Sequence, residues 1–407
     1  MSLRGDEQRE TILAATCAVI CRDGIDGVRS SAIAAEAGLT VPLLHYYFPT
    51  LDELVLAAYQ WDEARFRDAF DDGDPHAFLM ESAAGVFDLP EPAARAALRL
   101  WLEFVRRGVF DPAVRELVVT RLRRWGVAME AQLDVADPRA SSLRIAAGLG
   151  AGAFLLLLDI TDVDRAAREA RLGVDAGIAL PAGVIAAPDI PRWKVPEDDR
   201  RAAILDAALR VLGARGLRHT EFRAIAAEAE VSTTLPRYYH PTMRDLHEAL
   251  LVHAARRDAE RLAAATAPFA DPRDRVRAAL VHGLADADAH AVWTARTELL
   301  HLGMAEPELR ALAAAPFRDL AAVLAAELDE ARRRGHTAPD LDPQRTALGL
   351  AALRQGAATG WLVGALDRGE LTQVLLRSVE AALRGQSTPA WGSTRSSSSV
   401  TSRVRGE

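Results

Sequence analysis

The chain has 407 residues, half of them hydrophobic, and carries a formal net charge of −8 at pH 7. This length predicts two to four domains of about 100–200 residues each, and the dominance of Ala, Leu and Arg over β-branched and aromatic residues predicts helix nearly throughout. The net negative charge argues against a protein that coats nucleic acid in general, but it leaves room for DNA binding by a locally basic surface.

The first 50 residues contain three short helical patterns. An apolar helical face runs over 12–20, and Gly24 ends this helix where a left-handed residue is wanted. A short helix follows over 33–37, and a third runs over 40–47, with Thr40 able to cap its start. Two helices joined by a tight turn, the second one short and exposed, form the helix-turn-helix arrangement.

The same pattern occurs a second time. Residues 204–246 align without a gap onto residues 12–54 at an offset of 192, and 17 of the 43 positions are identical. A repeat of this spacing is much longer than the roughly 20–50 residues of a solenoid repeat. The sequence therefore indicates two fused copies of one whole protein, which we call copy one (residues 1–187) and copy two (residues 200–385).

The shared residues resemble a known DNA-binding motif. Copy one supplies Gly24, Ile33-Ala34, Ala37-Gly38-Leu39-Thr40, Tyr46-Tyr47-Phe48, Pro49-Thr50 and Leu54. Copy two supplies Gly216, Thr220, Ile225-Ala226, Ala229, Val231-Ser232, Tyr238-Tyr239, Pro241-Thr242 and Leu246. In type and order these residues resemble the helix-turn-helix of the TetR family of bacterial transcriptional repressors.

The resemblance implies an all-α fold of two TetR-like units. Each unit would have a three-helix DNA-binding head and a helical domain for ligand binding and dimerisation. The expected segments are a head at 1–55, a regulatory domain at 56–187, a proline-rich linker at 188–199, a second head at 200–247, a second regulatory domain at 248–385 and a disordered tail at 386–407.

The resemblance also implies how the copies pair. Family members pair two chains through their last two helices, whose counterparts here are 141–158 with 162–178 in copy one and 342–366 with 371–383 in copy two. Fusion would make this pairing intramolecular and give a pseudo-dimer, with further pairing of two chains left open. We expect such a regulator to bind a double-stranded DNA operator that is asymmetric, and to respond to an apolar or aromatic small-molecule inducer.

Both copies depart from the family pattern. The lysine that usually opens the fourth helix is replaced by Leu51 in copy one and by Met243 in copy two, which removes an expected phosphate contact from each head. Copy two has Glu230 in place of the turn glycine and His240 in place of a packing phenylalanine. Pro236 lies one turn into its third helix, so we expect the start of that helix to shift or tighten.

The third helix of each head would read base edges in the major groove. The expected DNA-contacting residues are Thr40, Val41, Pro42, His45 and Tyr46 in copy one, and Thr220, Ser232, Thr233, Thr234, Arg237 and Tyr238 in copy two. The alternative for each first tyrosine is simple packing in the core. Residues 1–54 contain 4 basic and 8 acidic side chains (4 − 8 = −4), whereas residues 194–246 contain 9 and 8 (9 − 8 = +1). Copy two is therefore expected to be the stronger DNA anchor.

Buried aromatic residues are candidates for the ligand pocket, although such residues are more often plain core. The candidates are Trp101, Phe104 and Trp125 in copy one, and Trp293, Thr297, His301 and Trp361 in copy two. The second set is favoured because it combines aromatic with clustered polar groups, Glu298 among them. The spacing of the histidines does not support a metal site, and nothing points to a cofactor.

Other functions have little support in the sequence. No phosphate-binding glycine loop, nucleophile elbow or zinc spacing is present, so an enzyme is not expected. Cys17 and Cys21 are expected to be small buried hydrophobes in a reducing cytoplasm. The most apolar stretch, 146–158, is shorter than the roughly 20 residues that cross a bilayer. The competing class is a helical ligand-binding or interaction protein in which one or both DNA-binding heads are degenerate.

Overall fold

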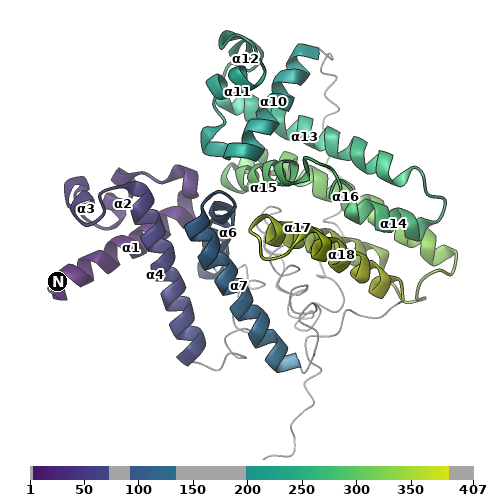
Figure 1. Cartoon of the computed structure of the whole chain (residues 1–407), viewed down its shortest axis with the longest axis horizontal. Coiled ribbons are helices and arrows are strands. Elements are labelled where there is room, and N and C mark those ends of the chain that lie inside the picture. The colour runs from purple at the N-terminus through teal and green to yellow at the C-terminus, as the bar shows by residue number, and fades with distance from the viewer. Residues whose placement is uncertain (1–2, 73–91, 134–198, 385–407) are drawn as a thin grey trace, which may run out of the picture.

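The computed structural model describes residues 3–72, 92–133 and 199–384, and within these ranges it contains helices and no strand (Figure 1). This confirms the expected all-helical fold for the described residues. The two copies lie side by side, copy one from purple to blue and copy two from teal to yellow.

The described helices of copy one form the head and part of the regulatory domain. They are α1 (Leu3–Asp23), η1 (Ile25–Gly27), α2 (Ser30–Glu36), α3 (Val41–Tyr47), α4 (Leu51–Asp72), α6 (Pro92–Phe110) and α7 (Pro112–Leu133). The expected pairing helices of this copy, 141–158 and 162–178, lie outside the described residues, as do most of the linker and the tail.

Copy two repeats these elements and continues beyond them. Its helices are α10 (Asp199–Arg215), η3 (Leu217–His219), α11 (Phe222–Glu228), α12 (Thr234–Tyr239), α13 (Met243–Thr266), α14 (Pro272–Val281), α15 (Ala289–Ala305), η4 (Pro307–Leu309), α16 (Arg310–Arg333), α17 (Pro343–Leu362) and α18 (Arg368–Leu383). The last two correspond to the pairing helices expected at 342–366 and 371–383.

Each head is built around the buried face of its first helix. Ile12 and Ile20 on α1 are fully buried, as is the equivalent pair, Ile204 and Leu212, on α10. Gly24 ends α1 with a φ of 70°, and its counterpart in copy two has a φ of 79°. A glycine with positive φ therefore ends the first helix in both copies, as predicted, but its ψ of 168° or 173° lies outside the left-handed helical region, in a region open essentially to glycine alone.

The third and fourth helices of each head begin at different kinds of cap. Thr40 stands at the N-cap of α3 in extended conformation, yet its side chain makes no capping hydrogen bond. The fourth helix is capped through its threonine instead: Thr50 accepts a hydrogen bond from the backbone N–H of Glu53. In copy two, Thr242 and Asp245 form a reciprocal capping box.

The expected change at the start of the copy-two recognition helix is confirmed. α3 begins at Val41, but α12 begins at Thr234, one residue later than the 192-residue offset places it. Pro236 then becomes the third helical residue, whose N–H has no partner inside a helix in any case, so the proline ring is accommodated without the loss of a hydrogen bond.

Each head packs tightly on the sixth helix of its own copy. In copy one, the Cys21 thiol on α1 donates to the carbonyl oxygen of Ala96 on α6 at 3.2 Å. Burial raises the pKa of Cys21 to about 11, as expected for an unreactive thiol. In copy two, Gly213 stands in place of Cys21, and α10 lies so close to α15 that a Cβ there would overlap the carbonyl oxygen of Ala291. The position of each head is thus tied to α6 or α15.

Candidate nucleic-acid interface and ligand cavity

The recognition helix of copy one, α3, is anchored by apolar residues and presents its other face to solvent. Leu44 and Phe48 are buried one turn apart on the inward face of the helix. Val41 is partly buried against the same core. The remaining expected contact residues, which are Thr40, Pro42, His45 and Tyr46, are exposed.

The first tyrosine of each pair is the most solvent-exposed large hydrophobic side chain in its head. Tyr46 is 77% exposed and Tyr238 is 78% exposed. Each stands edge-on against the next tyrosine, with ring centroids 5.3 and 5.4 Å apart, and Tyr47 is fixed by a hydrogen bond from its hydroxyl to Gln8. The packing alternative is therefore wrong for Tyr46 and Tyr238, whose rings and hydroxyls are free to reach a ligand outside the head.

The recognition helix of copy two, α12, offers a more polar surface. The exposed residues of α12 and of the two positions before it are Ser232, Thr233, Thr234, Arg237 and Tyr238. The hydroxyls of Ser232 and Thr234 are 3.0 Å apart. The guanidinium of Arg237 lies over the ring of Phe222, with its Cζ 5.1 Å from the ring centroid. This stacking holds the guanidinium in place and leaves its in-plane N–H donors available.

Thr220 does not fit the expected DNA-contacting role. Its side chain is 1% exposed, and its hydroxyl donates to the carbonyl oxygen of Gly216 at 2.9 Å. The N-cap of α11 is Glu221, and it makes no side-chain capping bond. Val28, the counterpart of Thr220 in copy one, is also buried. Thr220 therefore closes the turn within the head because a buried hydroxyl needs a partner.

A cavity of about 390 Å³ lies inside copy two, between α10, α13, α15 and α16. Leu251, Leu299, Leu300 and Phe317 are among its apolar walls. Charged groups at its edge are paired with each other. Asp258 accepts from Arg296 at 2.8 Å; burial would raise the pKa of Asp258, but the charge of Arg296 and a hydrogen bond with His282 hold it well below its usual range.

The expected pocket residues of copy two lie on other faces of the helices. Trp293 is buried beneath the guanidinium of Arg354, 4.4 Å from its ring centroid, and the Thr297 hydroxyl donates to the Trp293 carbonyl oxygen. Trp361 stands edge-on to His290. None of these residues lines the cavity between α10, α13, α15 and α16, and His301 does not line it either.

In copy one, the expected pocket residues belong to packed helices where their side chains are described. Trp101 and Phe104 on α6 are buried; Arg121 lies over the Trp101 ring, and Phe104 packs edge-on against Tyr59. Trp125 lies on α7, but its side chain is outside the described residues.

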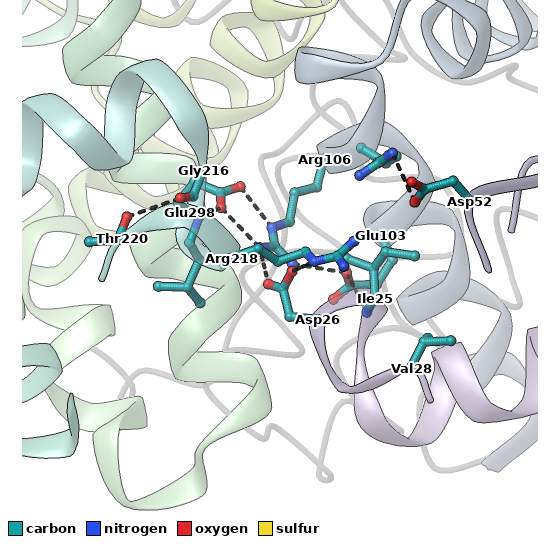
Figure 2. A network of polar contacts seen from close by, with 12 residues as sticks. Ile25, Asp26, Val28, Asp52, Glu103, Arg106, Gly216, Arg218, Thr220 and Glu298 are labelled. Carbon is teal, nitrogen blue, oxygen red and sulfur yellow. Dashed lines mark hydrogen bonds and ion pairs between the residues drawn. The ribbon is translucent and has the colours of Figure 1, made fainter. Parts of the chain in front are cut away.

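The copies touch through a buried polar network that the sequence alone did not reveal (Figure 2). Arg106 on α6 donates to both carboxylate oxygens of Glu298 on α15, at 2.7 and 2.9 Å. His301 on α15 lies 3.4 Å from Glu103 on α6. Glu298 and His301, expected at the polar end of a ligand pocket, therefore face the other copy.

One signal in the sequence could have pointed to this network. Both copies carry a glutamate followed three residues later by a base, as Glu103 with Arg106 and Glu298 with His301. On a helix this spacing places the two side chains on one face. In each copy the glutamate lies eight residues before the acidic residue of a helix-breaking acid-Pro step, at Asp111-Pro112 and Glu306-Pro307.

An all-helical chain with two heads, each presenting a short exposed helix behind a tight turn, has the architecture of a helix-turn-helix DNA-binding protein. Residues 12–58 and 204–250 each match the model for bacterial regulatory proteins of the TetR family, and residues 272–384 match the C-terminal model of BetI-type transcriptional repressors. The chain belongs to the TetR family, and the DNA-binding domain of that family occurs in it twice, as a tandem duplication. It is a helix-turn-helix transcriptional regulator.

Individual relatives are matched over about the length of one copy. The chain is 33% identical over 175 residues to the HTH-type transcriptional regulator BetI of Burkholderia thailandensis, a match that covers 42% of this chain and 84% of the relative. It is 27% identical over 150 residues to BetI of Paraburkholderia phytofirmans, covering 35% and 76%. A solved structure of a TetR-family regulator from Rhodococcus sp. matches with a TM-score of 0.42 and 26% identity, covering 46% of this chain and 99% of that one.

Two further observations concern the described residues alone. None of their helices is long and apolar enough to cross a membrane. They also contain no group of three or more His, Cys, Asp or Glu side chains placed to hold a metal ion.

Proposed function

We propose that this regulator binds DNA as a single-chain pseudo-dimer, with the head of copy one on one half-site and the head of copy two on another. The observation that carries this proposal is the exposure of Tyr46 and Tyr238 at equivalent positions of two complete heads on one chain. Because the two recognition helices present different side chains, the preferred operator should be an imperfect repeat rather than a palindrome.

The contact between the copies supports intramolecular pairing. Arg106 and Glu298 are 7% and 2% exposed, and a buried ion pair of this kind fixes the relative position of the elements that carry it. The pairing expected between α17 and α18 and the equivalent helices of copy one remains a proposal, since the latter lie outside the described residues. A second pairing between whole chains is compatible with both contacts.

We further propose that the inducer binds in the cavity of copy two. Its apolar walls suit an apolar or aromatic compound. The four helices that line it include α10 of the head and α15, so a ligand there would press on the junction that positions the head. The cavity is a better candidate than the cluster around Trp293, whose ring is already covered by two arginine side chains.

The test is DNA selection with the purified full chain, followed by titration of the selected site. One chain per site, an imperfect repeat and release by a compound found in a screen are expected. A perfect palindrome bound by a single chain would contradict the asymmetric operator. Complete loss of one half-site preference would favour the alternative that the head of copy one, with its charge of −4, is degenerate.

A further inference from the structure

Helices α6 and α15 are structurally equivalent at an offset of 195 residues. Both end just before an acid-Pro step, at Phe110 and Ala305. Each also holds the short turn that follows the first helix of its own head, η1 or η3, which we call the entry turn. Glu103 accepts a hydrogen bond from the backbone N–H of Ile25 at 3.2 Å, and Glu298 accepts one from the backbone N–H of Leu217 at 2.7 Å. Glu103 therefore corresponds to Glu298, and their i+3 neighbours, Arg106 and His301, correspond to each other.

Across the contact, the basic residue of each copy binds the glutamate of the other copy. Arg106 of copy one binds Glu298 of copy two, and His301 of copy two binds Glu103 of copy one. A two-fold interface has this form, in which residue i contacts j and j contacts i. Each glutamate thus joins the turn of its own head to a basic residue of the other copy. Figure 2 shows the half of this arrangement in which Arg106 binds Glu298.

One pair of equivalent residues breaks this symmetry through its charge. Asp26 in η1 and Arg218 in η3 are 192 positions apart, the offset of the two heads, and their side chains approach to 3.9 Å. Arg106 also binds Asp26. Two identical copies placed in the same way would bring like charges together here, aspartate against aspartate or arginine against arginine, which is unfavourable.

We propose that this surface is a head-to-head joint between the two copies, in which the entry turn of each head is held in place by the opposite copy and the Asp26–Arg218 pair selects copy two, rather than a second copy one, as the partner. The proposal deepens the single-chain pairing proposed above and rests on it. Its partner is therefore the other half of the same chain.

Burial makes the joint sensitive to single changes. Glu103, Arg106 and Glu298 are each less than 10% exposed, and a buried charge that loses its partner is strongly destabilised. Burial raises the pKa of Glu103, but the hydrogen bond with His301 and the charge of Arg106 outweigh it and lower the pKa to about 2. A change in one copy must therefore reach the entry turn of the other.

Hydrogen exchange of the full chain without DNA tests this directly. Arg106→Gln in copy one should raise exchange of the copy-two turn, in peptides covering 216–220, by about tenfold. Arg121→Gln is the matched control: Arg121 is an equally buried arginine of copy one, but it binds Asp62 and Glu63 of its own copy. The control should raise exchange in copy one and leave 216–220 unchanged.

Further variants complete the test. Glu298→Gln keeps an oxygen for the Leu217 N–H but removes the charge, so adding Arg106→Gln to it should raise exchange little further. Arg218→Asp sets a like charge against Asp26 and should raise exchange at 216–220 more than Arg218→Ala, which only removes the pair. If Arg106→Gln and Arg121→Gln affect copy two alike, or Arg218→Asp and Arg218→Ala have equal effects, the joint is overturned. Normal coupling in a chain that binds no operator would instead refute the proposed function.

Discussion

Glu230 adopts in copy two the left-handed backbone conformation that Gly38 adopts in copy one, with φ of 55° and 66°. A non-glycine residue in this region carries strain from its Cβ, whereas glycine carries none. The turn between the two helices of the motif therefore demands this conformation whichever residue occupies it, and copy two bears a cost there that copy one avoids.

The first prediction follows from this strain. Glu230→Gly should stabilise the head of copy two by about 1 kcal/mol. The gain should appear as slower hydrogen exchange in α11 and α12 of the full chain. Gly38→Glu, the reverse change, should speed exchange in α2 and α3 by a similar factor; a stabilising effect of Gly38→Glu would contradict the explanation by backbone strain.

A second prediction concerns pH and the residue at the end of each recognition helix. Arg9 lies 4.6 Å from the ring centroid of Phe48 in copy one, a favourable contact between a cation and an aromatic face. The equivalent residues in copy two are Arg201 and His240. Burial, and then the charge of Arg201, lower the pKa of His240 from 6.5 to about 4.

The lowered pKa gives a definite sign. The folded head keeps His240 neutral while the unfolded chain takes up a proton below pH 6.5, so stability is fully present above that pH and is lost as the pH falls toward 4, by up to about 1.4 kcal/mol per pH unit. His240→Phe should remove this loss. The measurement is the protection factor of the amides in α11 and α12, which is the exchange rate corrected for the intrinsic rate at each pH, between pH 7 and pH 4.5. If the protection factor depends on pH in His240→Phe as it does in the unchanged protein, the effect belongs to another group.

A third prediction ranks the two heads in DNA binding. Arg237→Ala should weaken operator binding more than His45→Ala, because an arginine is always charged and Arg237 lies in the less acidic of the two heads. If Arg237 binds a guanine, specificity should relax at one base pair, at a cost of about 1–3 kcal/mol. If it binds phosphate, affinity should fall evenly across sequences and the salt slope should shrink by about one. Equal losses in the two variants would refute the ranking.

The fourth prediction locates the inducer. Ala254 on α13 lines the cavity of copy two, so Ala254→Phe should fill it and abolish inducer binding in calorimetry while leaving operator binding within about twofold. Ala249→Phe is the matched control, a change of the same size on the same helix at a partly buried position that does not line the cavity. Loss of binding in Trp293→Ala alone, with the fold intact, would place the ligand in the buried Trp293 cluster instead. Loss in Trp101→Ala would place it in copy one.

Much of the head could be predicted from the sequence, because its structure depends on local signals. Glycine at 24 and 216, the inward pair Leu44 and Phe48, and the proline at 236 act within one or two helical turns. The exposed face of α3 follows from the same periodicity, since the residues that are not needed for the core remain outside.

The sequence did not predict the contacts between elements that are far apart in the chain. Glu298 and His301 form a polar cluster in the sequence, and nothing local distinguishes a cluster that faces a ligand from one that faces Arg106 on another copy. Thr220 was misassigned for a related reason: a threonine before a helix can cap it or close the turn behind it, and only the fold decides which carbonyl or N–H its hydroxyl meets.

The packing of Cys21 and Gly213 also constrains the gene. Tandem repeats in DNA invite recombination between the two halves, which tends to make them identical. Overwriting residues 204–246 with the sequence of 12–54 would place a cysteine at position 213, where its Cβ would overlap the Ala291 carbonyl oxygen, and an aspartate at position 218 opposite Asp26. The product of such an exchange should fold less stably, because both changes disrupt contacts that hold the head of copy two in place.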